Sequence, residues 1–228
     1  MLTSIYITFA PPLHTHYTSK TTQNNKKMTM SGTLTLAFTL FLLATCHGAR
    51  MLPETETNTE FIKTSCNTTS YPDLCFSSLS SYASKIQTSP LNLASTALSV
   101  SLSSARSTTA VLTNMSAAHG MDPHDKEAIH DCLDTLGDAV DDLRQSAETM
   151  SHLGGEKMGY QINSVQTWVS AALTDDNTCM DGFRSGGEDV MKDVRRHVLN
   201  VARLTSNALD LINGLSSTIT NSVPRNHT

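Results

Sequence analysis

Aromatic residues are scarce in this chain, where Phe, Trp and Tyr together make up 5% of 228 residues. Runs of aromatic and β-branched residues are also few, which disfavours a large β-sandwich or barrel. The 16 Lys and Arg residues are outnumbered by 21 Asp and Glu, and no Lys/Arg-rich stretch argues for a general nucleic-acid binder. With 11 Gly and 7 Pro, a collagen-like chain or low-complexity linker is excluded as well. What remains is typical of a helical globular domain.

Long hydrophobic runs are also missing, because the longest, residues 34–44 (LTLAFTLFLLA), falls short of the roughly 20 residues that span a bilayer. Two lysines precede this run, and the small-residue stretch 46–49 closes it. This order is typical of a secretory signal peptide. We therefore expect residues 28–48 to be a signal peptide that is cleaved after Gly48 or Ala49. The mature chain is expected to be secreted, with no membrane contact.

The start of the mature chain follows from the same assignment. Residues 1–27 are polar and precede the expected signal, so we expect translation to begin at Met28 or Met30, with an untranslated extension upstream. Without the extension and the signal, 13 Lys and Arg remain against 21 Asp and Glu, a formal charge of −8. Asn67 and Asn114 lie in N-x-S/T sequons, and we expect both to be glycosylated along the secretory route.

Cysteine is scarce too, and removal of the signal takes one of the five. The four that remain are Cys66, Cys75, Cys132 and Cys179. An even number in a secreted chain predicts disulfides, and four cysteines allow three connectivities. The spacing favours a local bridge across the turn between the first two cysteines, which leaves the last two to pair with each other. The other two connectivities stay open at this point.

Four long segments repeat apolar residues every three or four positions, as amphipathic helices do. They span about 90–118, 122–150, 160–174 and 188–215. Ser89 and Asp122, each followed by Pro, are typical N-caps for the first two segments. Short breaks favour antiparallel neighbours, so we predict an all-α fold with an antiparallel four-helix bundle over 89–216. Shorter helical stretches predict an N-terminal helical hairpin over 58–85, and residues 217–228 are expected to form a tail.

No motif for catalysis or cofactor binding is present. The sequence contains no P-loop, dinucleotide-binding glycine pattern, HExxH or G-x-S-x-G. Paired cysteines leave no thiol as nucleophile or ligand, and His124 and His130 are six residues apart, which does not place them on one helix face. We therefore expect no catalytic residue, no metal and no cofactor.

Asp134, Asp138 and Asp141 follow i, i+4, i+7 spacing and share a stripe on the second predicted helix. The ordinary interpretation of such a stripe is a solvated helix face. Acid–base chemistry on a glycoside needs carboxylates that oppose each other in a cleft, which one helix does not supply. A surface that faces a partner is the remaining functional interpretation. Trp168, with apolar neighbours at helical spacing, is expected in the core.

Four stretches carry a resemblance to a known family. They are TSCNTTSYPDLCFSSL (64–79), AIHDCLDTLGDAVDDL (128–143), VQTWVSAALTDDNTCMDGF (165–183) and LTSNALDLI (204–212). They resemble the plant invertase/pectin methylesterase inhibitor family, and the resemblance covers residues 58–216. It implies a non-enzymatic inhibitor protein that is secreted into the apoplast, with a helical hairpin on a four-helix bundle. It also implies the disulfides Cys66–Cys75 and Cys132–Cys179.

The resemblance further implies a target and a contact surface. The Pro-Lys-Phe motif typical of invertase inhibitors is absent, and the TWVSAAL run looks more like the inhibitors of pectin methylesterase. In those inhibitors the bundle lies across the pectin groove of the enzyme, and we expect this chain to act in trans in a one-to-one complex. The implied contacts are Asp134, Asp138, Asp141, Thr178 and Asp181. Asp134 stands where the family commonly has Glu, so its carboxylate reaches one methylene less far.

Three other functions are open at the level of sequence. The first is inhibition of a cell-wall or vacuolar acid invertase. The second is an unrecognised hydrolase that uses the aspartate stripe. The third is a secreted binding or signalling bundle with no enzyme as its target.

Overall fold

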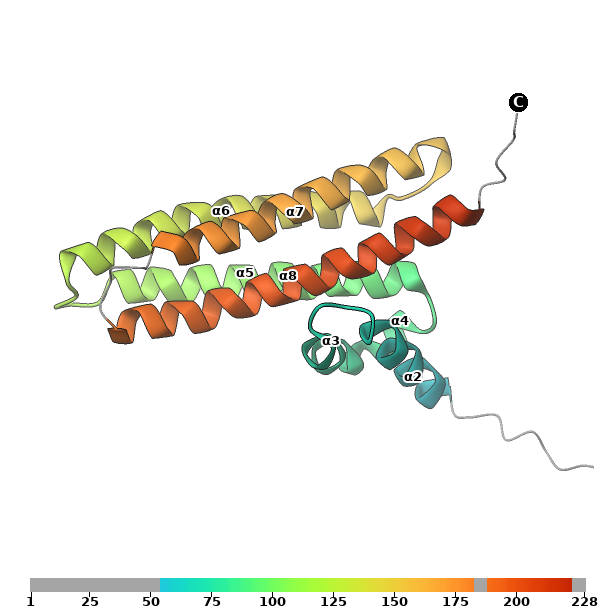
Figure 1. Ribbon diagram of the computed structural model, residues 1–228, viewed down its shortest axis with the longest axis horizontal. Helices are drawn as coiled ribbons and strands as arrows, with labels where there is room; N and C mark the ends of the chain where they lie inside the picture. Colours follow the sequence, from blue (N-terminus) through green and yellow to red (C-terminus); the bar gives the residue numbers. More distant parts are fainter. Residues whose placement is uncertain (1–53, 183–187, 223–228) are drawn as a thin grey trace, which may run out of the picture. The chain divides into compact units, whose positions relative to one another are not determined.

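The computed structural model describes residues 54–182 and 188–222, and Figure 1 shows their helices. The helices are α2 (Glu54–Cys66), α3 (Pro72–Leu79), α4 (Ala83–Ile86), α5 (Pro90–Ser116), α6 (Pro123–Ser151), α7 (Met158–Gly182) and α8 (Glu188–Ser222), with short 3₁₀ turns η1 (Ser80–Tyr82) and η2 (Gly155–Lys157). Within these two ranges no β-strand occurs, and the predicted all-α class is confirmed. The expected extension (1–27) and signal peptide (28–48) lie outside the described residues.

The two predicted N-caps are present. Each depends only on neighbouring residues, so the sequence alone was enough to predict it. The Ser89 side-chain oxygen accepts a hydrogen bond from the Asn92 backbone N–H at 3.2 Å. Asp122 Oδ1 accepts one from the His124 backbone N–H at 2.8 Å. A proline follows each cap as the first helical residue, where its missing N–H costs no helical hydrogen bond.

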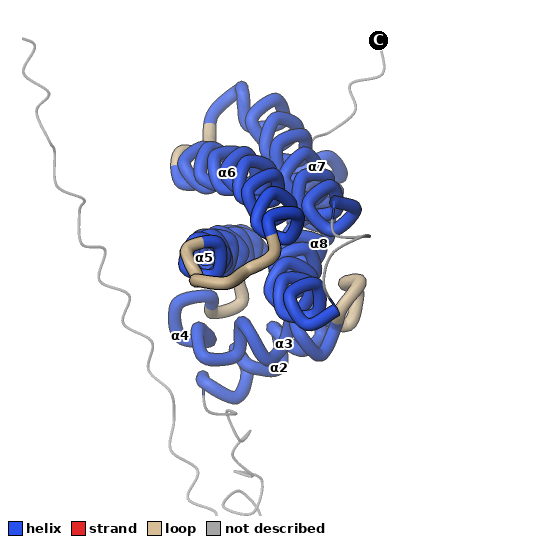
Figure 2. Tube along the Cα trace, turned by 90° about the vertical axis from the view of Figure 1, so that its left-hand side faces the viewer, coloured by secondary structure: helices blue, strands red, loops and turns tan. Residues whose placement is uncertain are grey.

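The four long helices pack as two antiparallel pairs. Two polar contacts set the register of α5 against α8: the hydroxyl oxygens of Ser101 and Thr205 lie 2.7 Å apart, and Asn200 Nδ2 donates to Ser104 Oγ at 3.2 Å. A later residue of one helix meets an earlier residue of the other, so the two helices run in opposite directions. Figure 2, a view along the bundle, shows α6 and α7 lying together above α5 and α8. Helices α6 and α8 are therefore diagonal to each other.

Leu, Ile and Val residues from every long helix fill the space between these pairs. Leu98, Leu143, Val165 and Ile212 are fully buried, one from each long helix. Burial of such a side chain contributes about 1.5–3 kcal/mol. A second buried cluster lies where α5 ends and α6 and α8 begin, and it includes the Cys132–Cys179 bridge.

The hairpin of α2, α3 and α4 is bonded to α8 at its turn. The Cys66–Cys75 disulfide closes the hairpin. The Tyr71 N–H donates to Asn207 Oδ1 at 2.9 Å, and Asn207 Nδ2 donates back to the Tyr71 carbonyl at 3.0 Å. Asp210 Oδ2 accepts from both the N–H and the hydroxyl of Ser70, each at 2.8 Å. These bonds fix where the hairpin ends along α8.

Three features differ from the expectations of the sequence analysis. Helix α7 does not end at Thr174 but continues to Gly182, which places Cys179 inside the helix. Helix α8 continues to Ser222, into the segment expected as a tail. Trp168 is half-buried rather than a core residue, because it lies on the flank of α7 between buried Val165 and Val169. Along the described chain, every helix is too short or too polar to cross a membrane.

Candidate functional site

The outer surface of α6 is strongly acidic. This helix carries eight Asp and Glu residues against two Lys and Arg. Asp134, Asp138 and Asp141 are all exposed, as the predicted stripe requires. A helix presents residues at this spacing on one face, so three carboxylates lie in a row on the surface of the bundle.

Helix α7 lies beside this row, held there by a covalent bridge. The Cys132–Cys179 disulfide joins α6 and α7, with 4.3 Å between the two Cα atoms. Thr178 directly precedes the second cysteine and Asp134 comes two residues after the first, so both lie within one turn of the bridge. Thr178 and Asp181 are exposed, and the Thr178 hydroxyl donates to the Thr174 carbonyl at 2.9 Å.

Carboxylates from the two helices come close enough to repel one another. The pKa of Asp142 is raised first by its burial and then by the charges of Asp138 and Asp141. The pKa of Asp175, on α7, is raised by burial and then by the charges of Asp138 and Asp142. We call the set Asp134, Asp138, Asp141, Asp142 and Asp175 the acidic face. A surface that holds uncompensated charges at such density favours a partner that neutralises them.

Sequence reasoning missed Asp175 as a member of this face. The signal was present in the run Thr174-Asp175-Asp176 ahead of the fourth cysteine, but the predicted helix ended at Thr174. Once α7 continues through this run, Asp175 lies next to α6 and Asp176 turns into the bundle.

Only two basic groups are paired with the acidic face within the described ranges. His130 Nδ1 lies 3.7 Å from Asp134 Oδ2, and both side chains are exposed. An Arg144 guanidinium nitrogen lies 3.2 Å from Asp141 Oδ1, one turn along the helix. Exposed pairs of this kind contribute little, about 0.2–1 kcal/mol. The face therefore keeps most of its negative charge available to a partner.

Asp176 differs from its exposed neighbours because it is fully buried. The Thr205 hydroxyl donates to Asp176 Oδ2 at 3.4 Å, while the described structure gives Oδ1 no hydrogen-bond partner. Burial raises the pKa of Asp176 to about 8, which outweighs the opposing effect of the Thr205 hydrogen bond. Below about pH 8 the interior of the bundle thus holds a neutral carboxylic acid.

The arrangement is suited to binding rather than to chemistry. All four cysteines in the described ranges are in disulfides, which leaves no thiolate there. No cluster of three or more His, Cys, Asp and Glu residues that could hold a metal occurs in residues 54–182 and 188–222. His124 and His130 are exposed, as are Asn67 and Asn114 of the two sequons.

Comparison with known proteins gives a consistent result. Residues 60–211 match the family model described as "Plant invertase/pectin methylesterase inhibitor". Pectinesterase inhibitor 10 of Arabidopsis thaliana is 46% identical over 166 residues, which cover 72% of this chain and 53% of that protein, so the match spans about half of that relative. Pectinesterase inhibitor 11 of the same plant is 38% identical over 189 residues, covering 80% of this chain and 94% of the relative.

A solved structure supports the fold. The crystal structure of mutant form A of a pectin methylesterase inhibitor from Arabidopsis superposes with a TM-score of 0.54 at 24% identity. The superposition covers 72% of this chain and 98% of that one. It agrees with the all-helical fold described above, a hairpin followed by four packed long helices.

Proposed function

We propose that this chain, which belongs to the plant invertase/pectin methylesterase inhibitor family, is a secreted inhibitor of a plant pectin methylesterase. It binds the enzyme one-to-one in the cell wall. Its acidic face lies over the pectin-binding groove and blocks access to the active site. The observation that carries this proposal is the cluster of carboxylates that α6 and α7 hold together on one surface.

Electrostatics explain why such a face suits this target. A groove that binds an anionic polysaccharide attracts negative charge, so the carboxylates of Asp134, Asp138 and Asp141 imitate the charge of the substrate. Attraction of this kind raises the rate of association and selects the partner.

Rigidity supports the same mechanism. Thr178 and Asp181 lie on α7, which the disulfide fixes against α6. Side chains on packed helices lose little conformational freedom on docking, so little ordering entropy opposes binding. The contact residues are therefore arranged before the enzyme arrives.

Inhibition is expected to weaken as pH rises from about 5 to 7. Because the pKa values of Asp142 and Asp175 are raised, first by burial and then by neighbouring aspartates, these groups hold their protons to higher pH than an ordinary aspartate does. Ionisation at higher pH adds negative charge next to the catalytic carboxylates of the enzyme, which opposes binding. Inhibition constants measured at pH 5, 6 and 7 test this expectation, and an affinity that stays constant excludes carboxylate protonation at the interface.

The decisive experiment is a titration of two enzymes with the disulfide-intact chain, residues 49–228, at pH 5.5. One arm contains a plant pectin methylesterase and the other an acid invertase, the second target that the family description includes. Stoichiometric loss of esterase activity alone supports the proposal. Loss of invertase activity alone overturns it, and an effect on neither enzyme rejects both targets for the isoforms used.

A further inference from the structure

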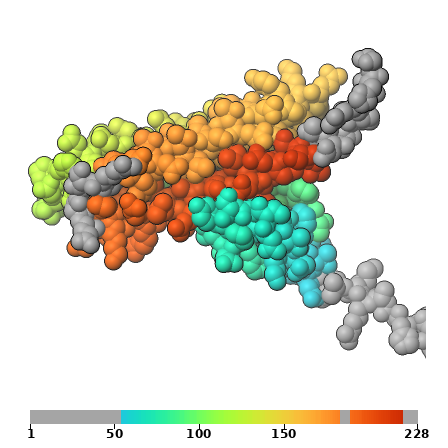
Figure 3. Space-filling model, viewed as in Figure 1, coloured from blue at the N-terminus to red at the C-terminus, as the bar shows by residue number. Residues whose placement is uncertain are grey.

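A groove lies on the other helix pair, where the hairpin leaves α5 and α8 uncovered. The hairpin is bonded to α8 at Asn207 and Asp210, and in the space-filling view it lies against only part of that helix (Figure 3). Beyond its edge, between α5, α8 and η1, is a hollow of about 730 Å³. Ligand sites typically measure about 300–1,000 Å³, so this space is large enough to hold part of a chain molecule.

Eight of the ten residues that line the hollow carry a polar group, although more of its exposed surface is apolar than polar. Its hydroxyl-bearing side chains come from η1 and α5: Tyr82, Ser103, Ser104, Ser107 and Thr108. Helix α8 contributes Arg196, His197 and Asn200. The Tyr82 side chain, at the hairpin edge, is among the exposed large hydrophobic residues. An aromatic ring beside a row of hydrogen-bonding groups offers one apolar surface and many polar contacts.

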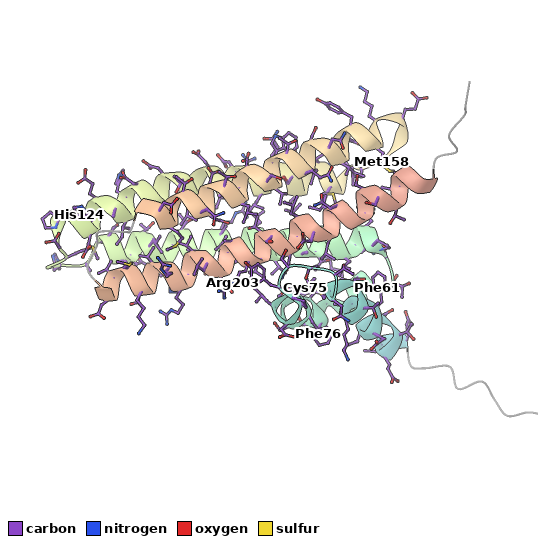
Figure 4. The ribbon with its side chains drawn as sticks, viewed as in Figure 1. Phe61, Cys75, Phe76, His124, Met158 and Arg203 are labelled. Atoms are coloured by element: carbon purple, nitrogen blue, oxygen red, sulfur yellow. A yellow bond between two sulfur atoms is a disulfide. The ribbon has the colours of Figure 1, made fainter. Side chains whose placement is uncertain are left out.

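The hollow continues along α8 past the end of the hairpin turn. A second space of about 350 Å³, lined by Tyr71, Asp73 and Arg203, shares Asn200 with the first. The Arg203 guanidinium lies 5.6 Å from the centre of the Tyr71 ring, at the hairpin edge that faces the open half of α8 (Figure 4). We call the two spaces together the basic groove.

The groove is lined by two arginines, Arg196 and Arg203, against one acid, Asp73, so it is weakly basic where the acidic face is strongly negative. Lys192 and Arg195 of α8 lie outside the lining but add positive charge nearby, against the single acid Asp193 in residues 192–203. Asp193 pairs with Arg196 at 3.2 Å, but the Arg196 side chain is 70% exposed. A guanidinium has five N–H donors, so this contact leaves most of them for a ligand.

We propose that the basic groove binds an anionic oligosaccharide. Arg196 and Arg203 pair with carboxylates along the sugar chain, because guanidinium groups bind carboxylates in a planar, paired geometry. The hydroxyls of Ser103, Ser104 and Ser107 and the Asn200 side chain hydrogen-bond to sugar hydroxyls, while Thr108 is buried and takes no part. The exposed rings of Tyr71 and Tyr82 pack against the apolar faces of the sugar rings.

The choice of galacturonate as the sugar rests on the proposed function, because de-esterified pectin is the product of the proposed target enzyme. The groove lies on α5 and α8, and the acidic face lies on α6 and α7 (Figure 2). One inhibitor can therefore hold the esterase on one side and wall polymer on the other, which retains it where de-esterification has occurred.

Calorimetric titration with oligogalacturonate of defined length, at low salt, tests the proposal. The Arg196→Gln/Arg203→Gln variant removes both cations from the groove and is expected to bind about tenfold more weakly, from the typical energies of exposed charge pairs. Arg144→Gln is the matched control, since Arg144 is an exposed arginine paired at 3.2 Å with an aspartate three residues earlier, just as Arg196 is. The control is expected to bind within about twofold of the unmodified chain.

Three results overturn the proposal. They are equal binding of the fully methyl-esterified oligomer, equal loss of binding in the Arg144→Gln control, and equal binding of a polyglutamate of the same charge. Circular dichroism confirms that each variant is folded. Esterase inhibition is measured on the same samples: the groove variant should inhibit normally if both proposals hold. Sugar binding without any inhibition rejects the proposed function alone, and inhibition without sugar binding rejects only the groove.

Discussion

The two helix pairs of the bundle use one scaffold for opposite surfaces. Helices α6 and α7 are joined by a disulfide and display carboxylates whose mutual repulsion raises the pKa of Asp142 and Asp175, in addition to the larger effect of burial. Helices α5 and α8 are joined by one buried hydroxyl contact and one exposed hydrogen bond, are partly covered by the hairpin, and display arginines beside a groove. The apolar core fixes the packing of both pairs, which leaves the outer positions of each helix free to carry a different charge.

The largest expected effect comes from removing the disulfide that joins α6 and α7. Cys132→Ala/Cys179→Ala opens a loop with a sequence separation of 47 residues and should lower the free energy of unfolding by about 4 kcal/mol. Cys66→Ala/Cys75→Ala opens a loop with a separation of nine and should cost about 2.7 kcal/mol. Urea denaturation of both variants measures the difference. A larger loss from the hairpin bridge would show that loop length does not govern the stability of these pairs.

Charge reversal tests whether the enzyme binds the α6–α7 pair and not the α5–α8 pair. Asp138→Lys places a cation in the middle of the acidic face and should weaken esterase inhibition about 100-fold. A lysine that faces the pectin-binding groove of the enzyme, which attracts anions, costs several kcal/mol of binding free energy. Arg196→Glu, on the opposite pair, should change inhibition less than about twofold. Inhibition constants at pH 5.5 and at two salt concentrations measure both effects. Equal losses would place the enzyme on neither face specifically.

How much of this the sequence could predict depends on the distance between the residues involved. The caps at Ser89 and Asp122 act over two or three residues, so local patterns were sufficient. Helical spacing separates Asp175 from Asp176, because Asp176 falls on the buried stripe of α7 with Ala172 and Cys179, but the predicted helix ended at Thr174. The hydrogen bond from Thr205 to Asp176 joins residues far apart on two helices, which no local pattern reveals.

The basic groove was missed for the same reason. It exists because hydrogen bonds to Asn207 and Asp210 hold the hairpin over one part of α8 and leave the rest open. Its lining comes from η1, α5 and α8 together, and the sequence does not show that these segments meet. The acidic stripe on α6, by contrast, was readable because one helix supplies it.

Asp176 predicts a dependence of stability on pH. Its pKa is about 8 in the folded protein against 3.8 for an unperturbed aspartate, so between these values the folded chain keeps a proton that the unfolded chain releases. The stability that this group contributes is therefore fully present below about pH 4 and falls by about 1.4 kcal/mol per pH unit until the pH passes about 8. From pH 5.5 to 7.5 the loss from this group should be about 3 kcal/mol.

Asp176→Asn should remove most of that slope, because the amide keeps the shape of the side chain but does not titrate. Asp175→Asn is the neighbouring control and should change the slope less, since Asp175 is only partly buried. Urea midpoints at several pH values give both slopes. An unchanged slope in Asp176→Asn would show that this carboxyl is not the group that titrates.

The smallest expected effect distinguishes the two arginines that have the same local geometry. Arg144 and Arg196 each pair at 3.2 Å with an aspartate three residues earlier, Asp141 and Asp193. Arg144→Gln leaves Asp141 of the acidic face without its arginine partner and should cost about 0.5 kcal/mol of stability. Arg196→Gln also breaks a pair, but it relieves repulsion among the cations of α8, so its net cost should be close to zero.

Thermal denaturation at low salt should resolve the difference, and about 1 M NaCl should remove it, because the screening length there falls to about 3 Å. If the two variants behave alike at low salt, the surrounding charge does not determine what each pair contributes, and the contrast between the two surfaces matters for binding but not for folding.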